Sequence, residues 1–320
     1  MTFTDIAELL ASIEEKTASA NLDNIRRTMA YQAFYERNPE IRWAFLASMV
    51  SRNAGWNMTD LQLDMFRCLL SARIRKQLFS LYERANWLIF SDAYPQLLLY
   101  EAHKQGKIDM TCHLRHFHVS AFMKEAWQLY LDENDGQRLL YSLIVNEQHV
   151  IGSPVIIQPF YQEHIFRRWP YLFQDLFRLN AVFFPTLDGK LYGLYAHHFT
   201  SIDDRIRMGK ELSQLLFHDQ LHQAFVQFAQ KTPHTASRND YERFGRFRTA
   251  GSGPLRQCYP VISHQDSIRK DWYRNGGIKQ NWLKAPADKE FRPTGSVFYW
   301  KRKMMALAAV FFKKKSKAVQ

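Results

Sequence analysis

The sequence contains few of the residues that interrupt secondary structure. Its 320 residues include 13 glycines and 11 prolines, and residues 1–150 hold only three of these glycines and two of these prolines. Few such interruptions predict long, continuous elements in the first half of the chain. Residues 232–320 hold six glycines and five prolines, which predicts a less regular C-terminal region.

Cysteine is also scarce, and long apolar runs are missing. Cys68, Cys112 and Cys258 lie far apart, which fits neither a disulfide framework nor a zinc ribbon and is typical of a reducing compartment. The longest apolar run, Met304–Phe312, has nine residues, whereas a bilayer span needs ~20. The N-terminus shows no signal-peptide pattern. We therefore expect a cytoplasmic protein.

Acidic residues are absent from the last 30 positions, which carry eight basic ones. Residues 1–231 contain 24 Lys and Arg against 25 Asp and Glu, whereas residues 232–320 contain 19 against 6. Such asymmetry informs about partners rather than about fold. It predicts a near-neutral helical body, residues 1–231, and a basic, loop-rich region, residues 232–320, that packs on the body and ends in a short apolar helix with a lysine tail.

The spacing of apolar residues predicts a mainly α fold. One apolar stripe follows a 4-3-4-3 spacing, which is typical of an amphipathic helix packed on a core; it consists of Ile74, Leu78, Leu81, Ala85 and Leu88. No alternating run of β-branched residues is strong enough to predict a sheet.

Several helix boundaries can also be predicted. Residues 38–40, Asn-Pro-Glu, predict a helix start, and Gly55 predicts its end. Thr59 and Ser91 are interpreted as N-caps of two further helices, the second of which ends near Gly106. Residues 201–230 form one long helical pattern.

Residues 49–60 are unusually rich in polar side chains for the end of an apolar helix. On a functional interpretation, Arg52, Asn53, Trp56 and Asn57 line a pocket in which Arg52 holds an anion and Trp56 stacks on a ligand. On a structural interpretation, which we favour, the same side chains satisfy free backbone groups at helix ends.

Residues 38–48 read Asn-Pro-Glu-Ile-Arg-Trp-Ala-Phe-Leu-Ala-Ser. Together with residues 49–60 they resemble the YppC-like family of uncharacterised proteins from spore-forming Gram-positive bacteria, and the resemblance covers most of the chain. It implies a cytosolic bacterial protein. It brings no activity, cofactor or catalytic residue that could be assigned to positions of this sequence.

Two histidine clusters could suggest a metal. Cys112, His113, His116 and His118 are of the ligand types that zinc prefers, but their spacing matches no zinc module and Arg115 would place a cation among them. We therefore predict no metal site there.

The second cluster, His218 and His222, is similar to the His-Glu-x-x-His pattern of zinc proteases. It has Asp219 where that chemistry uses a glutamate, so histidines that pack in the structure are favoured.

Signatures of common enzymes are missing: there is no Gly-x-Ser-x-Gly, no phosphate-binding lysine loop and no dinucleotide fingerprint. The loop at residues 251–254, flanked by arginines, could hold a phosphate, although an ordinary loop is favoured. We expect a non-enzymatic protein without a cofactor. The alternative is an enzyme with a site near Arg52, Trp56 and the histidines.

Basic and aromatic residues are interleaved between residues 238 and 300, as in 243–248 and 270–274. Cations bind phosphates and exposed rings stack on bases, so this mixture predicts nucleic acid as a polyanionic partner. The alternative is that the rings are buried and the cations solvated. The predicted contact residues are Arg243, Arg246, Arg248, Arg256, Lys301, Arg302, Lys303, Lys313, Lys314 and Lys315.

Residues 297–317 suggest a different partner, an anionic membrane surface. Basic residues at 301–303 and 313–317 bracket Met304–Phe312, and lysines at lipid headgroups stabilise binding by ~1 kcal/mol each. The run is apolar on all sides, which is atypical of an interfacial helix. A helix docked in the core with a solvated lysine tail is the favoured alternative.

Overall fold

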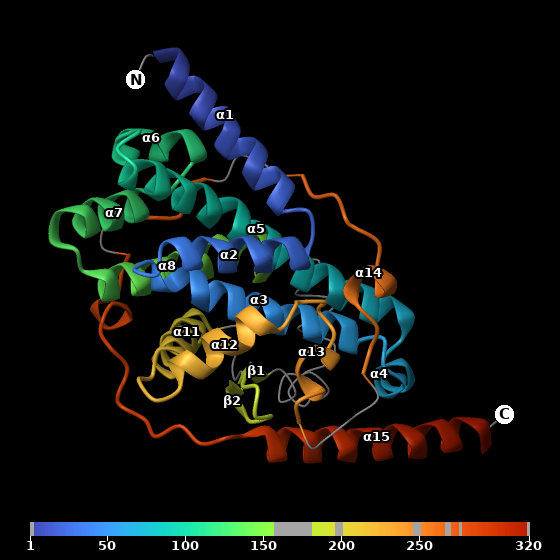
Figure 1. The fold of residues 1–320 in the computed structure, drawn as a ribbon. Helices are drawn as coiled ribbons and strands as arrows, with labels where there is room; N and C mark the ends of the chain where they lie inside the picture. The colour runs from blue at the N-terminus through green and yellow to red at the C-terminus, as the bar shows by residue number, and fades with distance from the viewer. Residues whose placement is uncertain are drawn as a thin grey trace.

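The computed structural model describes residues 3–156, 181–195, 201–245, 251–265, 270–274 and 277–318. These residues form a mainly helical structure with a small two-stranded sheet (Figure 1). The predicted fold class is confirmed. Prolines at positions 159, 170 and 185 predict short helices around residues 162–168 and 171–179, and these lie outside the described residues.

The elements in chain order are α1 (Phe3–Ala20), α2 (Asn24–Arg37), α3 (Arg42–Asp60), α4 (Asp64–Leu69), α5 (Ala72–Lys104), α6 (Met110–His113), η1 (Leu114–Phe117), α7 (Ala121–Glu133), α8 (Gly136–Val150) and the π-helical turn η2 (Gly152–Ile156). They continue with β1 (Ala181–Pro185), β2 (Leu191–Tyr195), α11 (Ile202–Leu216), α12 (His222–Lys231), α13 (Asn239–Glu242), α14 (Leu255–Cys258), η4 (Gln280–Trp282) and α15 (Gly295–Ala318).

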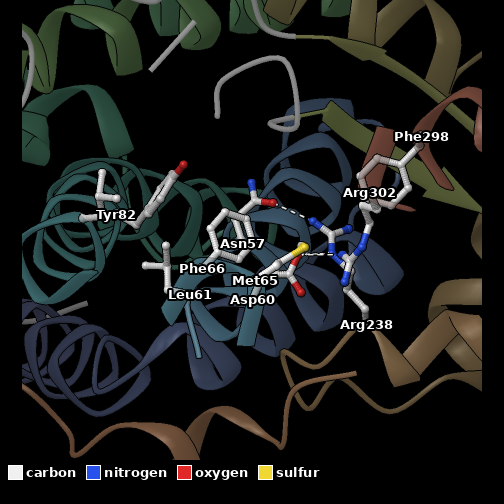
Figure 2. A pocket seen from close by; sticks show the side chains of 10 residues that line it. Asn57, Asp60, Leu61, Met65, Phe66, Tyr82, Arg238, Phe298 and Arg302 are labelled. Atoms are coloured by element: carbon white, nitrogen blue, oxygen red, sulfur yellow. Dashed lines mark hydrogen bonds and ion pairs between the residues drawn. The ribbon is translucent and has the colours of Figure 1, made fainter. Parts of the chain in front are cut away.

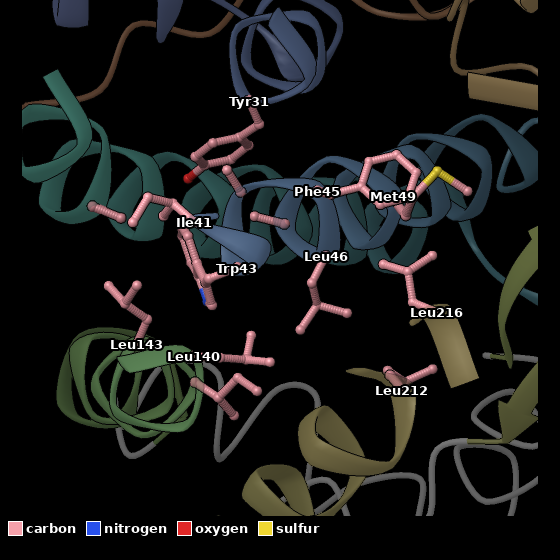
Figure 3. Packing of buried hydrophobic residues seen from close by; sticks show 14 of the residues in the cluster. Tyr31, Ile41, Trp43, Phe45, Leu46, Met49, Leu140, Leu143, Leu212 and Leu216 are labelled. Atoms are coloured by element: carbon pink, nitrogen blue, oxygen red, sulfur yellow. The ribbon is translucent and has the colours of Figure 1, made fainter. Parts of the chain in front are cut away.

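The core is built around α3, whose first half is buried on almost every side. A helix that is apolar all round has to be surrounded by other elements, and α3 contacts α2, α5, α8 and α11. Trp43 and Leu46 of α3 point toward Leu143 of α8 and Leu212 of α11 (Figure 3). The indole nitrogen of Trp43 donates a hydrogen bond to Glu147, 3.1 Å away.

Small polar residues line the contact between α2 and α3. The Thr28 hydroxyl donates to Ser51 Oγ at 2.7 Å, and Ser48 Oγ donates to the Thr28 carbonyl at 3.1 Å. Asn24 Nδ2 donates to the Ser51 carbonyl at 2.8 Å. Small side chains allow the two helices to approach closely, and the hydrogen bonds satisfy the polar groups that this approach buries.

Both predicted boundaries of α3 are wrong. The helix begins at Arg42 rather than after Asn38, and it continues through Gly55 to Asp60. Gly55 is needed inside the helix because a Cβ there would lie 2.7 Å from the Cβ of Ala236 and would also meet the Asn24 side chain. Thr59 is not an N-cap either: its hydroxyl bonds the Ala236 carbonyl at 2.6 Å.

Helix α5 contains the predicted apolar stripe but is longer than expected. It begins after Ser71, whose hydroxyl accepts from the Ile74 amide, and it runs on through Ser91 and Pro95. A proline inside a helix removes one backbone hydrogen bond, and the burial of residues 92–100 offsets that cost. The predicted end is confirmed, because the helix stops at Gln105 and Gly106 has a φ of 69°.

The two-stranded sheet was not predicted. β1 and β2 pair antiparallel, with Phe183 opposite Gly193, across a turn that contains Asp188 and Gly189, the latter with a φ of 82°. A single hairpin is marginally stable by itself, and here Asn53 of α3 extends the pairing. The Asn53 side chain accepts from the Phe183 amide at 2.7 Å and donates to the Phe183 carbonyl at 2.8 Å.

The predicted long helix at residues 201–230 is divided into α11 and α12, which are separated by a turn at residues 217–221. After α12 the chain forms short helices and extended segments along the outside of the body (Figure 1, orange to red). Several side chains of this region form ion pairs with acids of the body. The exposed ones include Arg256 with Asp23 (2.8 Å), Lys279 with Asp203 (2.7 Å) and Lys289 with Glu211 (2.7 Å).

The close packing at Gly55 predicts that Gly55→Ala destabilises the protein by about 1–3 kcal/mol, the usual cost of overpacking. In a helix without tertiary contacts the same change would stabilise the helix by about 1 kcal/mol. A decrease in the free energy of unfolding therefore indicates overpacking at Gly55. Chemical denaturation measures it. Gly136→Ala is the control, because a Cβ there has no atom nearer than 3.8 Å; equal effects at both positions would contradict the packing argument.

Candidate functional site

Helix α15 lies along one side of the body, and its C-terminal end projects past α4 in the view of Figure 1. Its inner face packs against α4 and buries Phe298, Tyr299, Arg302 and Ala309. Phe298 also contacts the ring of Phe183 in β1, with centroids 4.7 Å apart. The described side chains of α15 therefore form one buried and one exposed face.

A buried ion cluster anchors this inner face. Asp60 Oδ2, at the end of α3, accepts from Arg238 Nε at 2.5 Å and from Arg302 Nη1 at 2.8 Å (Figure 2). Arg238 also donates to Asn57 Oδ1 and to the Tyr241 hydroxyl, each at 2.7 Å. Burial by itself would lower the pKa of Arg238, but the neighbouring Asp60 and Tyr241 raise it above its usual range. One carboxylate thus joins α3, the segment before α13, and α15.

The cavity beside this cluster is small. Its volume is about 20 Å³, which is enough for roughly one water molecule. Both guanidinium groups also lie over the ring of Phe298, at 4.9 Å for Arg238 and 5.4 Å for Arg302. The cluster therefore serves to hold α15 in place rather than to take a ligand.

The outer face of α15 exposes a row of large apolar side chains. The row consists of Val297, Trp300, Met304 and Leu307, which recur at the spacing of one helix face, with Val310 at its edge. Trp300 is 63% exposed, and the other four side chains are about half exposed. We call these five residues the apolar stripe. Eight large hydrophobic residues are exposed among the described residues, and five of them belong to this stripe.

Two of the predicted polyanion contacts are engaged with acids of the body. Arg302 is 4% exposed and bonds Asp60, so its prediction as a surface contact is wrong. Its position on the helix turns it toward the buried carboxylate. Arg256 is exposed, but its guanidinium pairs with Asp23 at 2.8 Å.

The other predicted contacts differ in their surroundings. Arg243 is exposed and stacks on Phe244, Lys301 lies 4.0 Å from the ring centroid of Tyr195, and Lys303 is exposed on α15. Arg246 and Arg248 lie outside the described residues, and Lys313, Lys314 and Lys315 fall within α15 but their side chains are not described.

The aromatic residues of the basic region are mostly packed rather than free to stack on bases. Trp272 stacks on His149 with centroids 3.9 Å apart and donates to Asn146 at 2.9 Å. Trp282 is buried and donates to Asp203 at 2.7 Å. Trp300 in the apolar stripe is the most exposed large hydrophobic residue among those the structure describes.

The residues of the polar stretch at 49–60 serve the structure. Arg52 is 1% exposed and donates to the carbonyls of Thr232 and Ala229, each at 3.1 Å; burial lowers its pKa to about 10. Trp56 is fully buried and its indole nitrogen donates to Asp240 at 3.1 Å. Asn53 holds the sheet, as described above. Asn57 lines the small cavity together with Asp60.

The histidines that the structure describes do not gather into a metal site. Among the described residues no group of three or more His, Cys, Asp or Glu side chains could hold a metal ion. His218 and His222 do not share a helix face, because α11 ends at Leu216 and α12 begins at His222. His222 faces Tyr35 instead, at 3.2 Å, and His116 pairs with Glu14 at 2.8 Å.

Sequence reasoning missed the role of Asp60, because its partners Arg238 and Arg302 lie 178 and 242 positions away. A local signal for the apolar stripe does exist. The 3-4-3 spacing of Val297, Trp300, Met304 and Leu307 is visible in the sequence, although it does not say which face of the helix is covered.

Comparisons with known proteins agree with the resemblance found in the sequence. The family described as "Protein of unknown function (DUF2515)" matches residues 19–296. The uncharacterized protein YppC of Bacillus subtilis (strain 168) is 45% identical over 309 residues, which cover 95% of this chain and 96% of that protein. No solved structure matches the chain. Within the described residues, no helix combines the length and the apolar content that crossing a bilayer would require.

The ion cluster predicts that Asp60→Asn destabilises the protein by about 3–5 kcal/mol, because two buried guanidinium groups lose their counter-charge. Arg302→Met is expected to cost less, since Asp60 keeps Arg238 as its partner. Chemical denaturation measures both changes. Glu290→Gln, which removes the charge of an exposed ion pair with Arg292, is the control and should cost less than about 1 kcal/mol. A similar small cost for Asp60→Asn would rule out the anchoring role.

Proposed function

The chain belongs to the family of proteins of unknown function DUF2515, and from its own residues we propose that it attaches to the surface of an anionic membrane through the apolar stripe of α15. The observation that carries this proposal is the stripe itself: five large apolar side chains exposed together on one helix. Exposed apolar groups of this kind mark interaction sites.

The charges around the stripe favour a lipid surface as its partner. Lys303 is exposed on the same helix, lysines also occupy positions 313, 314, 315 and 317, and no acidic residue occurs in residues 291–320. Apolar side chains that enter the headgroup region, with lysines at the anionic headgroups, are the two contributions to interfacial binding. Trp300 near the middle of the described stripe adds the amphipathic ring that interfaces favour.

The way α15 is held supports the same proposal. Arg302 and Phe298 fix the inner face of the helix on the body, so the outer face is presented without any rearrangement. A preorganised surface binds with a smaller loss of conformational entropy than a free segment. The protein would lie on the membrane with α15 parallel to its plane.

We expect the full-length protein to co-sediment with vesicles that contain 30% phosphatidylserine and to bind phosphatidylcholine vesicles much more weakly. The double variant Trp300→Ser/Leu307→Ser should reduce the partition coefficient at least tenfold, because two apolar side chains of the stripe are lost. The matched control, Met29→Ser/Val261→Ser, removes two exposed apolar residues elsewhere and should bind as the wild type does.

The same assay separates the membrane from nucleic acid. Binding to short single-stranded RNA at low salt, together with no binding to phosphatidylserine vesicles, would overturn the proposal and favour nucleic acid as the partner. Equal loss of vesicle binding in both double variants would show that the stripe has no special role.

The contribution of charge can be tested separately. Lys303→Gln should weaken binding to phosphatidylserine vesicles about fivefold, since one lysine near the surface contributes ~1 kcal/mol, and should leave binding to phosphatidylcholine vesicles unchanged. An equal loss with both kinds of vesicle would contradict an electrostatic role for this lysine.

A further inference from the structure

A second surface feature lies away from α15, where the first turns of α3 and α8 meet the end of α11. A cleft of about 340 Å³ opens there, and residues 285–291 form its outer wall. We call it the Arg42 cleft. This volume is within the range of sites that bind small molecules.

The guanidinium group of Arg42 is the central feature of this cleft. It stacks on the ring of Phe217 at 4.1 Å, and Nη1 donates to Gln137 Oε1 at 3.2 Å. No ion pair to Arg42 is found within the part of the chain that the structure describes. Arg42 is half-buried and burial lowers its pKa, while the nearby charges of Tyr35, Tyr141 and Asp219 act in the opposite direction. Its charge is thus partly removed from water, and Asp219 lies near it without forming a direct ion pair. Such a group favours an anionic ligand, with which a guanidinium forms paired hydrogen bonds.

The neighbouring groups add hydrogen-bond donors. Gln137 uses its oxygen for Arg42 and one N–H for the Tyr141 oxygen, which leaves the second N–H of its amide to donate. The Gln220 amide donates to His218 Nδ1 at 3.4 Å, so Nε2 is the ring nitrogen of His218 that can donate. The starts of α3 and α8 also lie side by side, because a Cβ at Gly136 would be 3.8 Å from the Glu40 carbonyl. The positive ends of two helix dipoles therefore meet at this cleft.

Most of the nearby acids are engaged elsewhere. Glu40 pairs with Lys104 at 2.6 Å, Asp288 accepts from Gln214 at 3.1 Å, and Glu211 pairs with Lys289 at 2.7 Å. Asp219 is exposed and forms part of the cleft lining. The apolar part of the lining includes Phe291, whose ring meets that of His218 with centroids 5.8 Å apart.

We propose that the Arg42 cleft binds a small organic oxyanion, a carboxylate or a phosphate monoester attached to an aromatic or apolar group. The acidic group pairs with Arg42 and with the Gln137 amide, and the apolar group lies against Phe291. This site is separate from the apolar stripe and does not depend on membrane attachment.

Four probes that share one ring and differ in charge test this proposal by calorimetric titration of the full-length protein. Benzoate and phenyl phosphate should bind, and the stronger of them identifies the acidic group that the cleft prefers. Benzyl alcohol and benzylamine should bind at least tenfold more weakly. Tighter binding of benzylamine would mean that Asp219 and Asp288 dominate, and no binding of any probe at 10 mM would equally overturn the proposal.

Three variants locate the binding in the cleft. Arg42→Gln should weaken binding of the preferred anion at least tenfold, and Arg42→Lys should recover only part of it because lysine lacks the fork of donors. Phe291→Ala removes the contact between the Phe291 ring and the apolar group of the ligand, and should weaken binding severalfold. Arg138→Gln changes the net charge equally at an exposed position outside the cleft lining and should bind as the wild type does. Thermal unfolding without ligand verifies that each variant is folded, and equal affinity of Arg42→Gln and Arg138→Gln would refute the site.

Discussion

The shared carboxylate of Asp60 determines how the C-terminal part of the chain is arranged on the helical body. Its Oδ2 accepts hydrogen bonds from both Arg238 and Arg302, and all three groups are buried. Buried charges are costly unless they are paired or hydrogen-bonded, so this geometry fixes the start of α13 and the inner face of α15 at once. The apolar stripe is exposed as a consequence, because a helix that buries Arg302 and Phe298 has to turn its opposite face to solvent.

The same principle changes how the net charge of +12 is interpreted. The basic excess belongs to residues 232–320, but several of these cations meet acids of the body, as Arg256 meets Asp23 and Lys279 meets Asp203. The sequence suggests that positive charge is spread along this whole region. Where the region packs on the body, acidic residues of the body compensate part of that charge. Attraction to an anionic partner is expected to concentrate on α15, whose flanking lysines have no acid near them in sequence.

The two proposed sites use different physical means. The apolar stripe offers exposed apolar area beside lysines, which suits a broad lipid surface. The Arg42 cleft offers one guanidinium group, positioned by Phe217 and Gln137, which suits a single acidic group. Neither site uses Arg52 or Trp56, whose burial assigns them to the connection between α3 and residues 229–240.

The sequence by itself determined the helical fold class, the stripe from Ile74 to Leu88, the end of α5 near Gly106 and the division of charge, because each depends on residues close together in the chain. Only the tertiary structure decided that α3 continues through Gly55, that Asn53 supports a hairpin and that Arg302 is buried. These outcomes depend on partners more than 100 positions apart, such as Asn53 with Phe183 and Asp60 with Arg302. A local pattern shows which side chains are apolar or charged, but which of them meet is decided by packing between distant segments.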